Sequence, residues 1–124
     1  MKFQPDHAEG VNLISRHEPG RIWVQAQPHE GALIVPWRGQ PTPWVVEAGT
    51  APGRAAFEAL LAFKPEVVVY GSGARIVFPA HDWLRALYAV RIGVETMDTA
   101  AACRTYNVLA AEGRTVVAAL LPAG

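Results

Sequence analysis

A glycine–serine–glycine turn follows an apolar run in the middle of the sequence. The run is Val67–Tyr70, and Gly71, Ser72 and Gly73 come directly after it. Open α/β sheets commonly bind ligands where a buried strand ends. The backbone N–H groups of this turn could therefore form a small nest for an anion or a carbonyl, with Arg75 adding positive charge. A purely structural turn that needs positive φ explains the same glycines.

The turn completes none of the glycine-rich motifs that hold phosphates or carry a nucleophile. A dinucleotide fingerprint needs a third glycine at position 76, where the chain has Ile76, and a helix in place of the strand-like residues that follow. The Gly-Lys-Ser/Thr end of a P-loop is absent. A nucleophile elbow needs glycines two residues to either side of the serine, whereas here they are adjacent to it. The sequence therefore excludes these three sites.

Two carboxylates lie at the end of a short apolar segment. Glu95 is inside the segment, and Asp98 and Thr99 follow it. A carboxylate at a strand end can act as a general base or bind a ligand. The same groups can form structural ion pairs, which perturb acids as readily as catalysis does, and we favour this use. Three arginines are candidate partners: Arg75, Arg91 and Arg104.

Thr105, Tyr106 and Asn107 lie together in the middle of a helical segment. Thr and Asn are mediocre helix formers, because their side chains compete for nearby backbone groups. Tertiary hydrogen bonds would explain their presence. The triplet then either joins the helix to the sheet through a buried polar network or lines a cleft, and the network is the simpler interpretation.

Metal and nucleophile chemistry find little support. The four histidines lack the close second ligand that is typical of zinc sites, so no metal is expected: they are His7, His17, His29 and His81. Cys103 fits a small buried hydrophobe. Ser72, His81 and Asp82 supply the residue types of a hydrolytic triad, but adjacent residues on a helix diverge by about 100°, which is poor geometry for orienting the imidazole.

Two tryptophans bracket a proline-rich loop. Trp37 and Trp44 flank the loop Arg38-Gly39-Gln40-Pro41-Thr42-Pro43. Such a loop can form a peptide-docking surface, or its tryptophans can cap one end of the core. Both interpretations stay open.

The first third of the chain predicts short strands separated by turns. Alternation and β-branched residues predict strands over 21–26, 32–36 and 44–48. Pro28–Gly31 predicts a turn, and the three prolines of 36–43 predict a loop. This part should form a small β-meander.

The remainder alternates between helices and strands. Thr50 as a cap and Pro52 in the first turn open a helix that Pro65 ends. Asp98 or Thr99 caps another helix that runs to about Glu112. The other predicted elements are strands over 67–70, 74–78, 93–97 and 115–121 and a helix over 81–90. This pattern predicts a three-layer α/β fold with a central mixed β-sheet flanked by helices, plus the N-terminal meander.

Composition limits the class of protein. The 124 residues, 51% of them apolar, fit one domain over 1–124. Eleven basic and eleven acidic residues cancel, which disfavours a nucleic-acid partner. No apolar run approaches the ~20 residues of a membrane helix, and Pro5, Asp6 and Glu9 interrupt any signal-like stretch. We therefore expect a cytoplasmic protein without membrane insertion, in which a single unpaired cysteine is ordinary.

The final third carries a distinctive set of residues. They are Gly93-Val94-Glu95-Thr96-Met97-Asp98-Thr99, Ala102, Arg104-Thr105-Tyr106-Asn107-Val108-Leu109 and Glu112-Gly113-Arg114. Gly71–Gly73 and Pro79 fit the same pattern. With these residues, the chain resembles a small α/β family of uncharacterised bacterial and archaeal proteins. That family also includes the mitochondrial assembly factor 3 of respiratory complex I.

The resemblance implies the same three-layer fold and no established catalytic activity. Its eukaryotic member binds partner proteins during complex assembly, but no mitochondrial targeting segment is expected here. Carried over residue by residue, the family pattern marks a candidate surface or polar network. Its members are Gly71, Ser72, Gly73, Glu95, Asp98, Thr99, Thr105, Tyr106, Asn107 and Arg114.

The first functional hypothesis is a non-catalytic protein-binding or assembly module without cofactor, acting as a monomer or weak homodimer. Its site would be a cleft where the glycine turn and Arg75 meet Glu95 and Tyr106. The alternative is a protein or enzyme that binds a small anion at Gly71–Gly73, with Glu95 or Asp98 as base. In a third interpretation, the polar residues only hold the fold together and the Trp37–Trp44 loop is the working surface.

Overall fold

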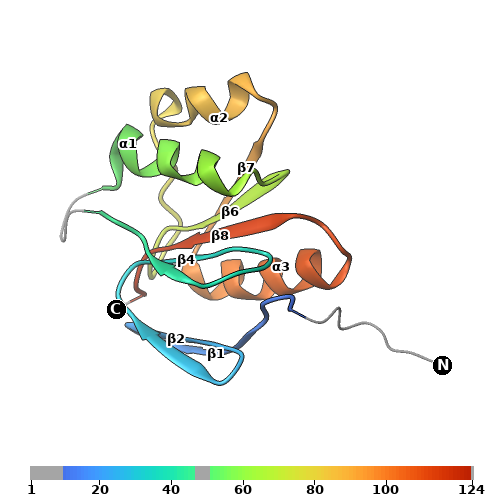
Figure 1. Cartoon of the computed structure of the whole chain (residues 1–124). Helices are drawn as coiled ribbons and strands as arrows, with labels where there is room; N and C mark the ends of the chain where they lie inside the picture. Colours follow the sequence, from blue (N-terminus) through green and yellow to red (C-terminus); the bar gives the residue numbers. More distant parts are fainter. Residues whose placement is uncertain (1–9, 47–50, 124) are drawn as a thin grey trace.

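The computed structural model describes residues 10–46 and 51–123 and contains two β-sheets (Figure 1). A three-stranded antiparallel meander consists of β1 (Ile14–Glu18), β2 (Arg21–Val24) and β3 (Gln27–Glu30). A five-stranded mixed sheet has the order β5-β4-β8-β6-β7. Its strands are β4 (Leu33–Val35), β5 (Thr42–Pro43), β6 (Val67–Gly71), β7 (Gly93–Met97) and β8 (Val116–Leu120).

The five-stranded sheet is the middle layer of three. One face carries α3 (Thr99–Ala111) together with the meander. The other face carries α1 (Gly53–Glu58), η1 (Ala59–Phe63), η2 (His81–Leu84) and α2 (Arg85–Ala89), as Figure 1 shows. The predicted three-layer fold with a central mixed sheet and an N-terminal meander is therefore confirmed.

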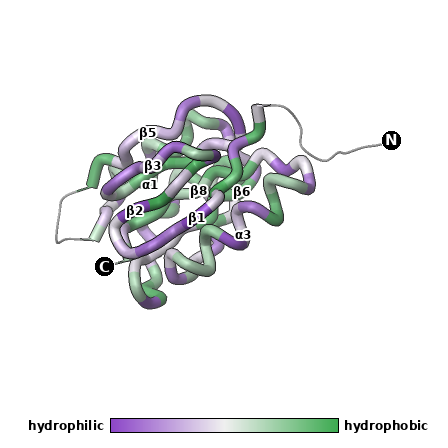
Figure 2. The backbone as a smooth tube through the Cα atoms, turned by 90° about the horizontal axis from the view of Figure 1, so that it is seen from below, coloured by the Kyte–Doolittle hydropathy of each residue, from purple (hydrophilic) through white to green (hydrophobic). Residues whose placement is uncertain are grey.

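β6 and β8 form the centre of the sheet and of the core. All five residues of each strand are buried, and the strands pair in parallel from Val67↔Val116 to Gly71↔Leu120. Strands covered on both faces need continuous apolar runs, which these two sequences supply. In Figure 2 the hydrophobic colour runs along both strands, between more hydrophilic outer elements.

The two faces of the sheet have separate cores. On the α3 side, Ile22 and Val24 of the meander pack with Tyr106 and the inward residues of the sheet. On the α1 side, Trp44 and Phe57 pack edge-to-face with ring centroids 5.4 Å apart. Tyr70 completes this aromatic cluster at 5.1 Å from Phe57.

α3 begins and ends where the sequence predicts. The Asp98 carboxylate accepts a hydrogen bond from the N–H of Ala101 at 2.8 Å, which caps the first turn. Gly113, with φ +85°, follows the last turn in the left-handed region that glycine tolerates.

Two predicted strands are wrong. Residues 74–78 form irregular backbone, because the Ser72 hydroxyl takes the Val77 N–H (2.9 Å) away from any ladder. In the predicted strand Trp44–Ala48, the described part is also irregular, since the Trp44 indole turns to the Ala56 carbonyl (2.9 Å). The segment that pairs with β4 is instead β5, which ends just before Trp44. Ala48 and the predicted cap Thr50 lie outside the described residues.

The turn predicted at Pro28–Gly31 is also wrong for most of its length. Residues 28–30 belong to β3, and the chain reverses earlier, at Gln25 and Ala26. Gln25 has φ +56°, and its Nε2 donates to the Val11 carbonyl at 2.9 Å, which holds this conformation. Pro28 is tolerated because β3 lies at the edge of the meander.

Candidate functional site

The end of β6 meets the start of α3 at a tightly packed corner. A Cβ added to Gly71 would lie 2.9 Å from Thr99 Oγ1 and 3.0 Å from Leu120 Cδ2. Gly71 is therefore needed for close approach and has ordinary φ, whereas Gly73, with φ +103°, makes the turn.

Thr99 joins three segments at this corner. Its Oγ1 accepts from the Gly73 N–H (2.9 Å) and donates to the Leu121 carbonyl (2.7 Å), while its own N–H donates to the Gly73 carbonyl (2.9 Å). The Ser72 N–H donates to the Met97 carbonyl at 2.9 Å. A nest needs free N–H groups. Two of those in the turn are already bonded, so the geometry disfavours anion binding here.

The Ser72 hydroxyl fixes the loop that follows. It donates to the Arg75 carbonyl (2.7 Å) and accepts from the Val77 N–H (2.9 Å). The loop so held exposes 49% of Ile76, 56% of Val77 and 70% of Phe78. These three consecutive exposed apolar side chains are a candidate interaction surface.

Tyr106 and Asn107 tie α3 to the N-terminal segment. The Tyr106 hydroxyl donates toward the carbonyls of Asn12 (2.9 Å) and Pro36 (3.0 Å). The Asn107 side chain donates to the Ile14 carbonyl (2.7 Å) and accepts from the Ile14 N–H (2.8 Å). Tyr106 and Asn107 therefore belong to a polar network rather than to a cleft wall, whereas the Thr105 side chain forms no hydrogen bond within the described residues. Burial raises the pKa of Tyr106 and leaves it no surface with which to touch a partner.

The other predicted site residues are dispersed. Arg75 and Glu95 are exposed, and Thr105 is half-buried on α3. Arg114 pairs with Glu66 at 2.9 Å, near the start of β6 and therefore at the opposite end of this strand from Gly71. The pKa of Glu66 is lowered by a hydrogen bond from the Thr115 N–H and, to a smaller extent, by the Arg114 guanidinium. The structure thus gathers Gly71, Ser72, Gly73, Asp98 and Thr99 at one corner and does not form the predicted cleft with Tyr106.

Nucleophile and metal chemistry gain no support from the described residues. Asp82 is engaged by Arg54 (3.2 Å) and Arg85 (3.1 Å), and His81 packs against Tyr88. No group of three His, Cys, Asp or Glu side chains in the described ranges is placed to hold a metal ion.

The two loop tryptophans lie on opposite faces of the sheet. Trp37 packs on the α3 side, and its Nε1 donates to the Ala110 carbonyl (3.1 Å). Trp44 is buried on the α1 side and donates to Ala56. Both rings pack against the core, Trp44 fully and Trp37 in part, but on opposite faces of the sheet rather than at one end of it.

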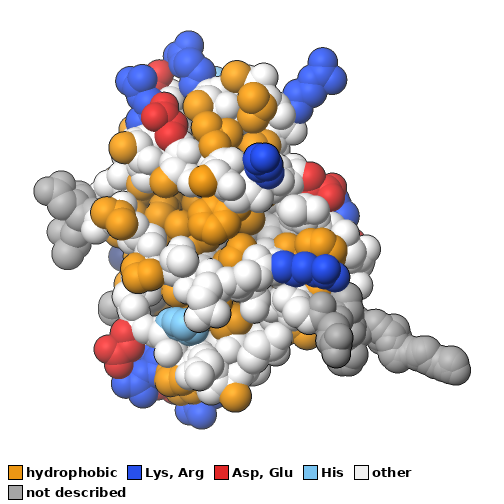
Figure 3. Space-filling view, viewed as in Figure 1, with side chains coloured by type: hydrophobic (Ala, Val, Ile, Leu, Met, Phe, Trp, Pro, Cys, Tyr) orange, Lys and Arg blue, Asp and Glu red, His pale blue; other side chains and the backbone are white. Residues whose placement is uncertain are grey.

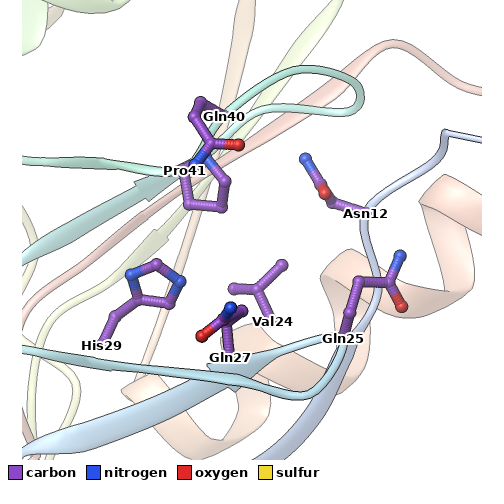
Figure 4. Close-up of a pocket in the computed structure, with 7 residues that line it drawn as sticks. All are labelled: Asn12, Val24, Gln25, Gln27, His29, Gln40 and Pro41. Atoms are coloured by element: carbon purple, nitrogen blue, oxygen red, sulfur yellow. The ribbon is translucent and has the colours of Figure 1, made fainter.

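A cavity of about 340 Å³ opens between the meander and the loop after β4 (Figure 4). In the close-up, Gln40 and Pro41 lie on the loop side, opposite His29 and Gln27 of β3. No local pattern in the sequence predicts this cavity, because its walls come from distant segments. Its lining is Asn12, Val24, Gln25, Gln27, His29, Gln40 and Pro41.

A second, more apolar hollow of about 260 Å³ lies between α1 and β4–β5. Figure 3 shows hydrophobic side chains gathered across the middle of that face. Val45, 87% exposed, stands at its rim. Its walls include Ile34, Pro43, Trp44 and Phe63.

Among the described residues, no helix has the length and apolarity to cross a membrane. The family described as "Protein of unknown function (DUF498/DUF598)" matches residues 14–121. An uncharacterized protein of Rhodobacter capsulatus is 35% identical over 113 residues, which cover 91% of this chain and 86% of that protein.

A shorter match reaches the human NADH dehydrogenase [ubiquinone] 1 alpha subcomplex assembly factor 3. The two chains are 43% identical over 63 residues, which is 51% of this chain and 34% of the assembly factor. The matched part thus spans only about a third of that relative's length.

Solved structures show the same fold. A crystal structure of a Bordetella parapertussis protein superposes with a TM-score of 0.85 at 35% identity, covering 94% of this chain and 99% of that one. A solution structure from Bordetella pertussis, described as a Mth938-like domain, has a TM-score of 0.76 at 31% identity and covers 100% and 94%.

Proposed function

The chain belongs to the DUF498/DUF598 family of proteins of unknown function, and from this premise we propose that it is a non-catalytic protein-binding or assembly module. Its docking surface is the loop Gly71–Phe78. The observation that carries the proposal is the Ser72 hydroxyl, which holds Ile76, Val77 and Phe78 outward in one fixed conformation. A prearranged apolar loop binds with less loss of conformational entropy than a flexible one.

The charge of the loop indicates the chemistry of the partner. Arg75 is exposed and forms no ion pair within the described residues. The partner should therefore present apolar side chains beside an acidic group, because complementary charges steer association and fix its register.

The relatives support an assembly role without defining the complex. The human relative is by name an assembly factor, and it is similar to about half of this chain. We place the present protein in the cytoplasm, as a monomer or weak homodimer, and its single cysteine is in keeping with a reducing compartment. The alternative of an anion-binding protein has less support, since Thr99 and Met97 already bond the N–H groups of the turn.

The test compares two matched double variants. Arg75→Glu/Phe78→Ser alters the proposed surface. Val90→Ser/Arg91→Glu makes the corresponding charge reversal and apolar-to-serine change at another exposed apolar–arginine pair, before the start of β7 and so at the other end of the sheet. Each tagged protein is cross-linked in its own cells and purified, and its partners are quantified by mass spectrometry.

We expect the first double variant to lose the partner that wild type retains, and the second to keep it, with both melting like wild type. Equal recovery from both variants would show that the loop is not the docking surface. Failure of wild type to retain any protein would contradict the module itself.

A further inference from the structure

The inner face of the meander changes from apolar to polar at β3. The register pairs Ile22 with His29 and Val24 with Gln27, and cross-strand partners point to the same side of a sheet. Ile22 and Val24 are buried against the core, and their partners His29 and Gln27 project to the same side at the edge of the meander, where His29 is half-buried and Gln27 is exposed. Apolar residues there would close the gap to the neighbouring layer. These polar ones instead line the cavity of about 340 Å³.

Two carboxamides in the cavity wall are fixed by the fold. The Asn12 Nδ2 donates to the carbonyls of Pro36 and Gly39, both at 2.8 Å, and Asn12 is only 8% exposed. The Gln25 Nε2 donates to Val11 at 2.9 Å. Within the described part of the chain, neither side-chain oxygen receives a hydrogen bond, so each is a pre-positioned acceptor.

The remaining residues of the cavity wall add further hydrogen-bonding groups and apolar surface. Gln27, His29 and Gln40 can donate and accept, while Val24 and Pro41 supply apolar surface. No carboxylate, lysine or arginine lines the cavity, so a charged ligand would lose its hydration without gaining a counter-charge. The volume lies at the small end of the range for small-molecule sites.

We propose that this cavity binds a small uncharged molecule through a planar amide or lactam edge. The N–H groups of such an edge donate to the fixed oxygens of Asn12 and Gln25. Its carbonyl accepts from Gln40 or His29, and its flat face lies on Val24 and Pro41. The cavity contains no residue of the Gly71–Phe78 loop, so this proposal is independent of the protein-binding proposal.

The test uses two pairs of probes that differ in charge. Uracil and benzamide present the uncharged amide edge, whereas orotate and benzoate carry a carboxylate on the same rings. Each is titrated into the ¹⁵N-labelled full chain, and the side-chain amide signals of Asn12, Gln25, Gln27 and Gln40 are followed by NMR. We expect saturable shifts with the uncharged probes and at least tenfold weaker binding of the anions.

Three variants separate the cavity from the rest of the sheet. Gln40→Leu and His29→Leu should each weaken uracil binding about tenfold, the effect of one lost hydrogen bond to the ligand. His17→Leu is the control, because His17 pairs with Ile22 on the same face but does not line the cavity. Gln40 is exposed on a loop, so its replacement leaves the fold intact.

Three results would overturn the proposal. They are the absence of saturable shifts at 20 mM probe, equal binding of the charged analogues, and a loss in His17→Leu as large as in His29→Leu.

Discussion

Replacing Tyr106 by phenylalanine removes one oxygen from the buried network and leaves the ring in place. The Pro36 carbonyl keeps a donor, since the Asn12 Nδ2 lies 2.8 Å away. The Asn12 carbonyl has no second donor among the described residues, so it becomes a buried acceptor without a hydrogen bond. An orphaned buried polar group costs about 1–3 kcal/mol.

This cost converts into a measurable change in melting temperature. An unfolding entropy of about 2.1 cal/mol/K per residue gives about 0.26 kcal/mol/K for 124 residues. Tyr106→Phe should therefore lower the melting temperature by about 4–12 °C. Differential scanning calorimetry at pH 7 measures the shift, and urea unfolding gives the free energy directly.

Tyr88→Phe is the matched control. The Tyr88 ring is 42% exposed, and no hydrogen bond to its hydroxyl is formed within the described ranges. Its loss should change the free energy of unfolding by less than about 0.5 kcal/mol. If Tyr106→Phe melts like wild type, or if both variants lose equal stability, the hydrogen-bond reasoning fails. A stable Tyr106→Phe that no longer binds a partner would instead support the cleft interpretation.

Three further predictions concern the corner, the cysteine and an exposed ion pair. Gly71→Ala should lower the free energy of unfolding, measured in urea, by about 1–3 kcal/mol, because the new methyl group would lie 2.9 Å from a threonine hydroxyl. Gly93→Ala is the control: its methyl group meets nothing within 4 Å, so the loss should be less than about 1 kcal/mol. Burial, partly offset by a neighbouring arginine, raises the pKa of Cys103 from 9.0 to about 11, so the thiol should resist Ellman's reagent at pH 8 until denaturant is added. Because the folded chain binds this proton more tightly, stability should fall as pH rises from about 9 to 11, and this component should vanish in Cys103→Ala. Arg114→Ala should raise the pKa of Glu66 in an NMR titration without restoring its ordinary value, since the largest cause, a backbone hydrogen bond, persists.

The second half of the fold follows from local signals. A run of β-branched residues marks β6, Asp98 marks the start of α3, and Gly113 marks its end. Each signal lies within a few residues of the structure that it determines. Periodicity and capping rules therefore locate these elements from the sequence.

The first third depends on distant contacts and is less predictable. β1 (Ile14–Glu18) has no clear apolar alternation of its own, and it exists because β2 and α3 pair and pack with it. Pro28 and Gly31 look like turn residues locally, but the Gln25 side chain places the reversal earlier in the chain.

The candidate site also combines features that local sequence predicts with features that depend on distant contacts. Thr105 and Asn107 stand out in sequence as mediocre helix formers, which predicts tertiary hydrogen bonds around Tyr106. The structure has such bonds at Tyr106 and Asn107, but the Thr105 side chain forms none within the described residues. The partner of Tyr106 is Asn12, 94 residues away, and nothing local identifies it. The exposure of Ile76–Phe78 was missed because strand propensity is high there, and one hydroxyl, that of Ser72, overrides it.

The position of β8 has a consequence for synthesis of the chain on the ribosome. Among the strands of the described residues, β8 comes last in the sequence, yet it lies between β4 and β6 and joins the two halves of the central sheet. Until it emerges, β4 and β6 each present an unpaired edge, and such edges favour aggregation. The two halves of the sheet can therefore join only after residues 116–120 have been made, and a nascent chain truncated before Val116 should require a chaperone to stay in solution.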